Sequence, residues 1–399
     1  MAHQKLVQLL GAVDGIPSVE FYKLEAELYF MKENIKTAED NRKLEEATQE
    51  CINRATRAKN THLQLILRWH QIENVYCRVF SSPDDVKRRM SDDLEKLRRE
   101  TMDAVASLED TAKYCKHATL CRLFAYIACG YVDLGEFKQG LEILALCEGR
   151  GWHLRPVKCD LGPRLSSEHI GNFHYAKGRL YSFKFIASSS SPSADAGQAL
   201  EWKRLAVENF ELSKKAYMAK ESSHAPSAET YHVCEVAMCC LQLTRVYLDL
   251  REHAIDEPLS SEDLEKANTC LLEGVTYYDV YTRESGRGSV RVAARVDWWR
   301  SLLCYRMYQS CEQALLHGIL LEQAKFHCDR SAEKLKNSGY SDRGSILALF
   351  VRISDKLGRL LASRAAVSAP SPDVHMRSTG TSGCSSQITS VRVSPEAQD

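Results

Sequence analysis

The sequence contains few of the residues that turn or break a chain. It has 20 glycines and 10 prolines among 399 residues, well below the roughly 12% that these two types usually contribute. No glycine lies between Gly15 and Gly130, and no proline lies between Pro258 and Pro370. Few turn residues permit few turns, so the secondary-structure elements must be long. This composition argues against a sandwich or barrel of short strands.

Net charge and long apolar runs are lacking too. The 53 Lys and Arg residues balance 53 Asp and Glu residues, which argues against a protein-wide attraction to nucleic acid or to an anionic membrane. No apolar run approaches the roughly 18 residues of a membrane-spanning helix. The N-terminus shows no secretory leader pattern. We therefore predict a protein of the nucleus or cytoplasm that has no membrane partner.

The cysteines do not show the spacing that is typical of disulfide frameworks or of zinc sites. The 15 cysteines are an odd number, and most lie in apolar, helix-like runs, such as Cys129 in YIACGYV and Cys304 in LLCYRM. This usage is typical of reduced thiols packed in a core. Two clusters lack the paired C-x-x-C spacing of zinc sites, so we predict that no metal is bound. They are Cys115, His117 and Cys121, and Cys234, Cys239 and Cys240.

The sequence also lacks the common catalytic motifs. The sequence contains no G-x-S-x-G nucleophile elbow, no phosphate-binding loop, no dinucleotide fingerprint and no H-E-x-x-H zinc motif. Its closest glycine-rich piece, Gly286-Arg287-Gly288, lacks a following Lys-Ser or Lys-Thr pair. We therefore predict a protein that is not an enzyme, with no catalytic residues and no cofactor.

Apolar residues recur at the spacing of helices instead. Positions three and four apart predict helices near 18–36, 60–80 and 83–114. Alternation with period two is not sustained anywhere. Three prolines precede further candidate helices that begin near Ser167, Ser227 and Ser261. The sequence therefore predicts an all-α protein of a dozen or more helices and no sheet.

Composition divides the chain into three parts. We expect a helical N-terminal segment over 1–115, helical repeats over 116–364, and a tail over 365–399. The tail has no aromatic residue and few large apolar ones, so it cannot offset its ordering entropy and we predict it to be disordered. The small, polar stretch SSSSPSADAGQ predicts a flexible loop at 188–198.

One helical pair carries a specific spacing, in the stretch LFAYIACGYVDLGEFKQGLEILALCE at 123–148. Large, small and aromatic residues follow one another there in the order and at the spacing of the tetratricopeptide (TPR) repeat. They are Phe124, Ala128, Tyr131, Gly135, Phe137, Gly140, Leu144 and Cys147. The stretch therefore resembles one TPR repeat. Small residues let two helices approach closely, and glycine permits the tight turn between them. We therefore expect Gly140 to face Ala128.

Degenerate copies of this spacing follow along the chain. They include Gly178, Tyr181, Ala206, Phe210 and Ser213, then Leu243, Thr244, Tyr247, Ala267, Leu271 and Gly274, then Cys304, Ala324, Cys328 and Ser331. Together the copies predict a right-handed α-solenoid of TPR-like helical hairpins. An ordinary helical bundle is the alternative, because small residues also occur at helix contacts there.

Residues 168–280 resemble one family of TPR proteins in particular. The stretches EHIGNFHYAKGRLYSFK, ALEWKRLAVENFELSKKAYMAK and AETYHVCEVAMCCLQLTRVYLDL are similar to the repeats of the meiotic family typified by yeast sporulation and synapsis-initiation proteins and their testis-expressed animal relatives. The resemblance implies a role on meiotic chromosomes, in crossover formation or synapsis.

A solenoid holds its partner on the concave surface lined by the first helix of each pair. We therefore predict a non-enzymatic protein-protein interaction scaffold that holds an extended peptide or a helix. The exposed polar positions of the first helices are the candidate contacts: Arg122, Tyr126, His174, Lys177, Gln242 and Arg245.

A basic stripe suggests an alternative partner. Arg283, Arg287, Arg291 and Arg295 recur every four residues and are followed by Trp298. Guanidinium groups beside aromatic rings are what a single-stranded nucleic-acid groove uses. The alternative function is therefore a helical-repeat protein that binds RNA or single-stranded nucleic acid through Arg287, Arg291, Arg295 and Trp298.

Overall fold

The computed structural model describes Leu28 and residues 38–76, 84–106, 114–154, 157–158, 165–188, 196–219, 226–249, 258–285, 290–337 and 345–368. Its helices are α3 (Ala38–Arg57), α4 (Thr61–Tyr76), α5 (Asp84–Ala106), α6 (Tyr114–Leu134), α7 (Phe137–Gly149), α8 (Glu168–Ala187), α9 (Ala196–Met218), α10 (Pro226–Tyr247), α11 (Ser261–Ser285), α12 (Val290–Ser310), α13 (Ala314–Asn337) and α14 (Ser345–Ser368). A short 3-10 helix, η1 (Trp152–Leu154), follows α7.

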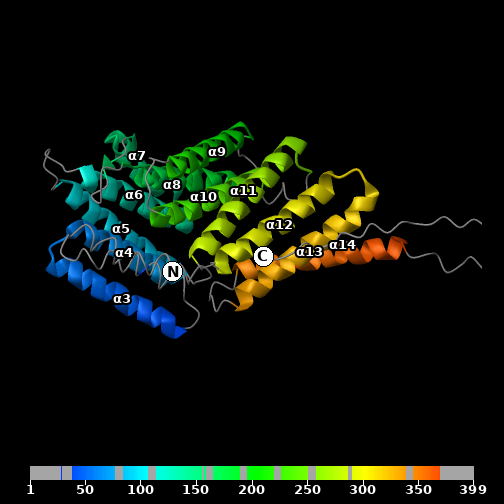
Figure 1. Ribbon diagram of the computed structural model, residues 1–399, viewed down its shortest axis with the longest axis horizontal. Helices are drawn as coiled ribbons and strands as arrows, with labels where there is room; N and C mark the ends of the chain where they lie inside the picture. The colour runs from blue at the N-terminus through cyan, green and yellow to red at the C-terminus, as the bar shows by residue number, and fades with distance from the viewer. Residues whose placement is uncertain are drawn as a thin grey trace, which may run out of the picture.

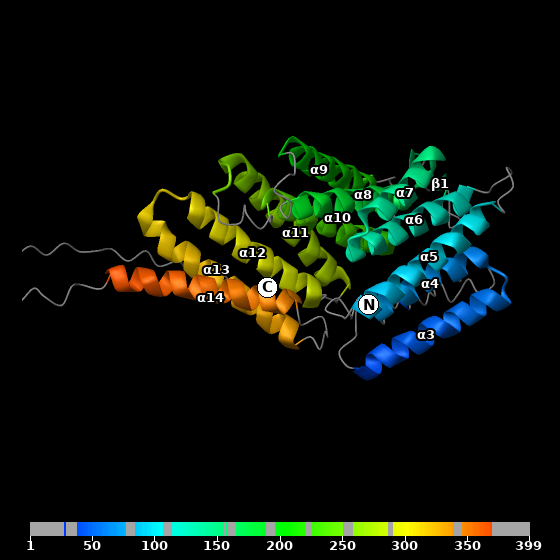
Figure 2. The same cartoon turned by 180° about the vertical axis from the view of Figure 1, so that it is seen from behind.

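The molecule is elongated, and its helices follow one another along the long axis. Helices α3 to α5 lie at one end and α12 to α14 at the other (Figures 1 and 2). The all-α prediction is confirmed for the described residues. The sequence did not predict one small feature, an antiparallel pairing of β1 (Val157–Lys158) with β2 (Leu165–Ser166) just before α8.

Several predicted boundaries agree with the structure. Helices α8, α10 and α11 begin at or within one residue of the predicted Ser167, Ser227 and Ser261. The helices expected near 60–80 and 83–114 are α4 and α5, both shorter than predicted within the described residues. The prediction for 18–36 falls outside the described residues except at Leu28, which is buried.

Two predicted boundaries need correction. Helix α9 begins at Ala196, so the end of the predicted loop at 188–198 is helical. Helix α14 continues to Ser368, four residues into the predicted tail, and residues 369–399 lie outside the described residues. One apolar cluster also joins α4 and α5 to α6, α7 and α8. The described residues on either side of the boundary predicted at 115 therefore share a core.

The best repeat match forms a tight helical hairpin from α6 and α7. Gly135 lies in the turn with a φ of 79°, the left-handed region that favours glycine. A methyl group built on Gly140 would lie 3.5 Å from the carbonyl oxygen of Ala128 and 3.0 Å from Leu180 Cδ1. The expected close approach of Gly140 to Ala128 is therefore present.

Three more hairpins follow, made by α8 with α9, α10 with α11, and α12 with α13. In the first, Gly171 lies under Tyr217 and Gly178 under Phe210, so the two helices are antiparallel. In the last, Ser301 Oγ donates a hydrogen bond to the carbonyl of Ala324 at 2.6 Å. Helix α14 then packs on α13, where Lys325 Nζ donates to Ser354 Oγ at 3.3 Å.

Corresponding helices of neighbouring hairpins run parallel in two cases, α6 with α8 and α9 with α11. We call α6, α8, α10 and α12 the first-layer helices, and α7, α9, α11 and α13 the second-layer helices. In the first layer, Cys121 Sγ lies 3.7 Å from the carbonyl of His169, and further along the same two helices Arg179 forms an ion pair with Asp133.

The second layer shows the same parallel order. Lys203 of α9 pairs with Asp263 of α11 at 2.8 Å, and eleven residues on, Lys214 pairs with Glu273 at 2.6 Å. The chain is therefore an array of side-by-side helical hairpins, whose first-layer helices present a common face.

Candidate partner-binding surface

One face of the first-layer helices is turned away from the second layer. On α6, α8 and α10, the residues that pack on the second layer include Ala128, Gly178 and Cys240. Side chains elsewhere on these helices contact one another across the layer, and one of them, Tyr175, lies at its border, where its ring also packs edge-on against Phe210 of α9 with centroids 5.8 Å apart. We call this set the first-layer stripe: Arg122, Tyr126, Cys129 and Asp133 of α6, Tyr175, Arg179 and Phe183 of α8, and Gln242 and Arg245 of α10. All but Arg122 are partly exposed.

Aromatic and charged side chains open the stripe on α6. The ring of Tyr126 stacks on Trp69 of α4, with centroids 5.7 Å apart. The guanidinium of Arg122 lies over the same tyrosine ring at 5.5 Å and pairs with Glu168 of α8 at 3.3 Å. A cation held between an aromatic face and a carboxylate is well ordered, so this end of the stripe is preorganised.

The middle of the stripe joins three helices. Arg179 of α8 forms an ion pair with Asp133 of α6 and lies 5.7 Å from the ring centroid of Phe183. Arg245 of α10 lies over that same ring at 4.3 Å. Gln242 of α10 donates to the hydroxyl of Tyr175 at 3.5 Å. The face is therefore continuous across α6, α8 and α10.

The hydroxyls and thiol of the stripe are held in their neutral forms. Burial raises the pKa of the Tyr126 and Tyr175 hydroxyls well above the usual range, and it raises the pKa of Cys129 to about 11. Burial, with the nearby charges of Arg179 and Arg295, lowers the pKa of Arg245 to about 10. At neutral pH the stripe therefore offers neutral hydroxyl donors and charged guanidinium groups.

Four of the predicted contact residues lie in the stripe: Arg122, Tyr126, Gln242 and Arg245. The other two do not, which corrects the predicted register of α8. His174 Nδ1 lies 3.0 Å from Asn209 Oδ1 of α9, and Lys177 pairs with Glu148 of α7 at 2.5 Å, so both face the second layer.

Sequence reasoning missed the stripe residues of α8. Tyr175, Arg179 and Phe183 are spaced four residues apart, which is the signal that identifies one face of a helix. Apolar side chains lie all round α8, as Phe173, Leu180 and Phe185 show. For that reason the apolar pattern did not single out a solvent-facing side.

The predicted nucleic-acid patch is not assembled as a groove within the described residues. Arg287 lies outside them, and for Arg291 only the helical backbone is described. Arg295 is half-buried, near enough to Arg245 to influence its pKa. Trp298 is 6% exposed and belongs to the apolar core cluster that joins α10 to α14. Its ring is therefore not placed to stack on a base, which corrects that part of the prediction.

The cysteine clusters are spread over different contacts. Cys239 faces Ser213 of α9 at 3.3 Å, whereas Cys240 faces Gly274 of α11. Across the described part of the chain, no three His, Cys, Asp or Glu side chains are grouped so that they could hold a metal ion. The same residues include no helix that is both long enough and apolar enough to span a bilayer.

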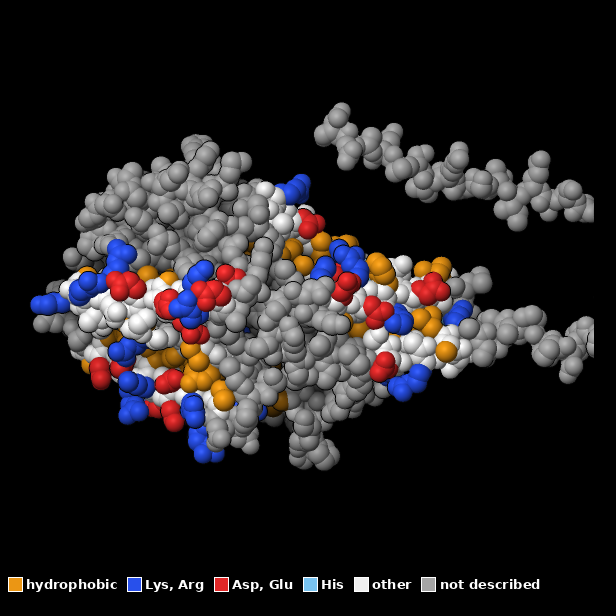
Figure 3. Space-filling model, turned by 90° about the horizontal axis from the view of Figure 1, so that it is seen from below, with side chains coloured by type: hydrophobic (Ala, Val, Ile, Leu, Met, Phe, Trp, Pro, Cys, Tyr) orange, Lys and Arg blue, Asp and Glu red, His pale blue; other side chains and the backbone are white. Residues whose placement is uncertain are grey.

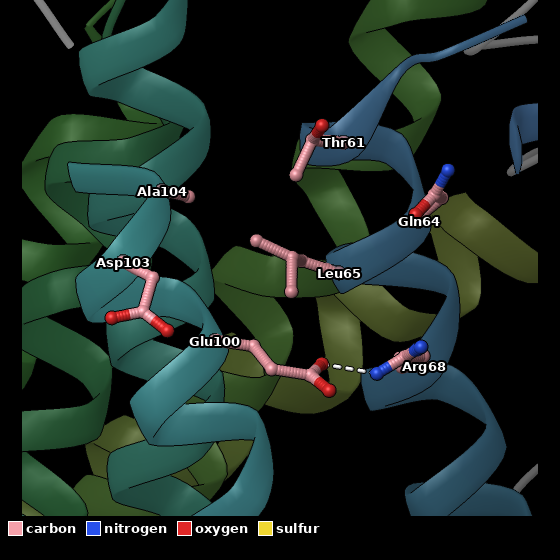
Figure 4. Close-up of a pocket in the computed structure, with 7 residues that line it drawn as sticks. All are labelled: Thr61, Gln64, Leu65, Arg68, Glu100, Asp103 and Ala104. Carbon is pink, nitrogen blue, oxygen red and sulfur yellow. Dashed lines mark hydrogen bonds and ion pairs between the residues drawn. The ribbon is translucent and has the colours of Figure 1, made fainter. Parts of the chain in front are cut away.

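A shallow cleft between α4 and α5 is a poor ligand site. It is lined by Thr61, Gln64, Leu65, Arg68, Glu100, Asp103 and Ala104 (Figure 4). An ion pair between Arg68 and Glu100 crosses it, so its main charges compensate one another. Only Leu65 and Ala104 among its lining side chains are apolar, which is little for a small molecule to bury.

The exposed charges of the molecule are mixed in sign. In the view of Figure 3, basic and acidic side chains lie side by side on the described part of the face. Many belong to pairs within one helix, such as Arg42 with Glu39 and Arg204 with Glu201. Such exposed ion pairs are hydrated, keep the surface polar and contribute little to the free energy of folding.

No protein-family model, curated protein or solved structure matches the chain.

Proposed function

We propose that this chain is a non-enzymatic scaffold that binds a segment of another protein along the first-layer stripe. The hairpins are taken as TPR-like repeats of a right-handed α-solenoid, with the stripe on the concave side. Repeat proteins of this kind lack chemistry of their own and bind partners over an extended face.

The observation that carries the proposal is the continuity of the stripe over three helices. Tyr126, Phe183 and Arg245 belong to three different hairpins, and contacts between neighbouring side chains connect them. An extended or helical peptide laid across the first-layer helices would meet aromatic faces, guanidinium groups and neutral hydroxyls in succession. These side-chain types are the ones enriched where binding energy concentrates.

Two finer expectations stay predictions. The meiotic role rests on the family resemblance of residues 168–280, and residence in the nucleus or cytoplasm rests on composition. Binding of RNA or single-stranded DNA is the alternative function. Burial of Trp298 and the mixed charge of the stripe favour a protein partner over it.

The proposal is tested by panning a displayed library of random peptides against the full chain. We expect the enriched peptides to lose about tenfold in affinity on Tyr126→Ala, because the stacked ring is part of the surface. Tyr126→Phe keeps the ring and should retain binding. Phe326→Ala on α13, where the side chain is 52% exposed, is the matched control outside the stripe.

The result that contradicts the proposal is equally specific. Peptides that bind the Tyr126 and Phe326 variants alike place the site elsewhere, and a library that yields no binder removes the peptide-binding function. Circular dichroism of each variant separates lost binding from lost fold. Tight binding of labelled oligothymidylate, with a steep loss of affinity as salt increases, would favour the nucleic-acid alternative.

A further inference from the structure

Arg245 differs from the other arginines of the first-layer stripe in that its charge is not balanced. Arg122 pairs with Glu168 and Arg179 pairs with Asp133. Among the described residues, no carboxylate forms an ion pair with Arg245, whose guanidinium instead lies 4.3 Å from the ring centroid of Phe183. The stripe thus contains one cation that is set over an aromatic ring and forms no ion pair within the described residues.

The surroundings of Arg245 make this imbalance costly. Phe183 also carries Arg179 at 5.7 Å, so two cations share one ring. Burial, Arg179 and Arg295 each lower the pKa of Arg245 and so disfavour its charge, and together they outweigh Tyr175 and Asp133, which act in the opposite direction. Neighbouring positive charges and partial burial destabilise a charged guanidinium. An anionic group of a bound partner would stabilise it.

A second donor lies beside Arg245, on α8. The Tyr175 hydroxyl accepts a hydrogen bond from Gln242, one turn before Arg245 on α10. Within the described part of the chain, that hydroxyl donates its own proton to no acceptor. Tyr175 and Arg245 are both partly exposed. The junction of α8 and α10 therefore presents a guanidinium and an O–H donor, each available to an incoming acceptor.

We propose that Arg245 and Tyr175 together receive the carboxylate of an aspartate or glutamate in the partner segment, so that the scaffold selects acidic peptides. The proposal rests on the proposed function and names the chemistry of its partner. A guanidinium donates two parallel hydrogen bonds to a carboxylate, and a phenol donates a third. Phe183 lies beneath, where an apolar neighbour of the acidic residue can pack.

Charge complementarity favours a peptide with an isolated acidic residue over a polyanion. The stripe contains carboxylates as well as arginines, since Asp133 and Glu168 lie beside Arg179 and Arg122. A chain with a negative charge at every unit, such as single-stranded nucleic acid, would meet these carboxylates. A peptide places one carboxylate at Arg245 and neutral residues elsewhere.

The test compares two labelled peptides by fluorescence anisotropy on the full chain. One is a Gln-Leu-Ala repeat peptide with a single central glutamate in place of glutamine, and the other is the all-glutamine peptide of the same length. We expect the glutamate peptide to bind about tenfold more tightly, because only its carboxylate matches the guanidinium. Arg245→Gln should abolish this difference. Arg204→Gln, in an exposed pair with Glu201 on α9, is the matched control and should preserve it.

A second readout does not depend on affinity alone. Removing an unbalanced cation should raise the melting temperature of the free Arg245→Gln protein. The glutamate peptide should raise the melting temperature of the unsubstituted chain but not of this variant.

Equal binding of both peptides, with both weakened by Tyr126→Ala, overturns the acidic preference but leaves the proposed function standing. Discrimination that survives Arg245→Gln, or preferential binding of oligothymidylate, also overturns it. If neither peptide binds and panning yields no binder, both proposals fail.

Discussion

The α6–α9 region and the α12–α13 hairpin achieve the same close helix packing with different residues. In the former, glycines lie at the contacts, with Gly140 against Ala128 and Gly178 under the ring of Phe210, and one serine hydroxyl also donates across, from Ser213 to the carbonyl of Gly171 at 2.8 Å. In the latter, the contacts are closed by serines, whose hydroxyls donate across the hairpin: Ser301 to Ala324 and Ser331 to Ala294, at 2.6 and 2.7 Å. Close approach needs a small residue, and glycine is only one of the residues that permit it.

The difference explains why the repeat pattern fades along the chain while the packing does not. A glycine contact excludes larger residues by steric overlap alone. A serine contact adds a buried hydrogen bond to a backbone carbonyl of the neighbouring helix, so it depends on polarity as well as size. The two kinds of contact should therefore respond differently to substitution.

The largest expected effect is at Gly178. A methyl group there would lie 2.8 Å from the buried ring of Phe210, closer than real side chains approach. We expect Gly178→Leu to lower the free energy of unfolding by about 3 kcal/mol, because the overlap cannot relax without moving a core aromatic residue. Urea unfolding measures the change. Gly149→Leu, at an exposed glycine with no atom nearby, is the control and should be close to neutral.

Gly140 should give a smaller loss, since its nearest neighbour is the tip of the flexible Leu180 side chain at 3.0 Å. We expect Gly140→Leu to cost about 2 kcal/mol and Gly140→Ala to be near neutral, because helix propensity offsets the tighter contact. Thermal melts of the two variants decide the point. A melting temperature for Gly140→Leu equal to that of the unsubstituted chain would show that this contact is not close.

Ser331 tests the polar version of the contact. Ser331→Ala keeps the size small but removes the hydrogen bond to Ala294, so we expect a loss of about 1 kcal/mol in urea unfolding. Thr276→Ala is a suitable comparison. The hydroxyl of Thr276 is exposed and bonds only within its own helix, to Leu272 at 2.9 Å. If neither variant changes the free energy of unfolding, the hydrogen bond contributes nothing, and the small size of the residue is the only requirement at the serine contact, as it is at the glycine contact.

The smallest expected effect is a pH dependence in the glycine region. Burial lowers the pKa of His174 and of His153, which lies beside it. Below a pH of about 6.5, the unfolded chain binds protons at these imidazoles while the folded chain resists them. The free energy of unfolding should therefore fall as the pH decreases through that range. Urea midpoints at several pH values should show a shallower fall for His174→Gln. An unchanged slope would mean that other groups carry the dependence.

The two faces of α8 show how far the sequence could predict the candidate surface. The spacing of small residues identified the hairpins and their contacts, because steric exclusion at Gly140 or Gly178 is a local requirement. The direction of His174 and Lys177 could not be predicted in the same way. Helix α8 packs on α6, α7, α9 and α10, so nearly every side of it carries apolar residues. The positions of these four neighbouring helices decided which polar residues of α8 face solvent.

The sequence by itself determined the helical class, several helix starts and the small residues at the hairpin contacts. Each follows from backbone preference, periodicity or residue size over short spans of chain. The tertiary structure alone decided that Trp298 is buried, that Arg179 meets Asp133 and that Arg245 forms no ion pair with a carboxylate of the described residues. It also placed Arg306, fully buried, where it donates to the carbonyls of Leu248 and Asp249 at the end of α10. These outcomes depend on which distant helices come together, and no local pattern encodes that.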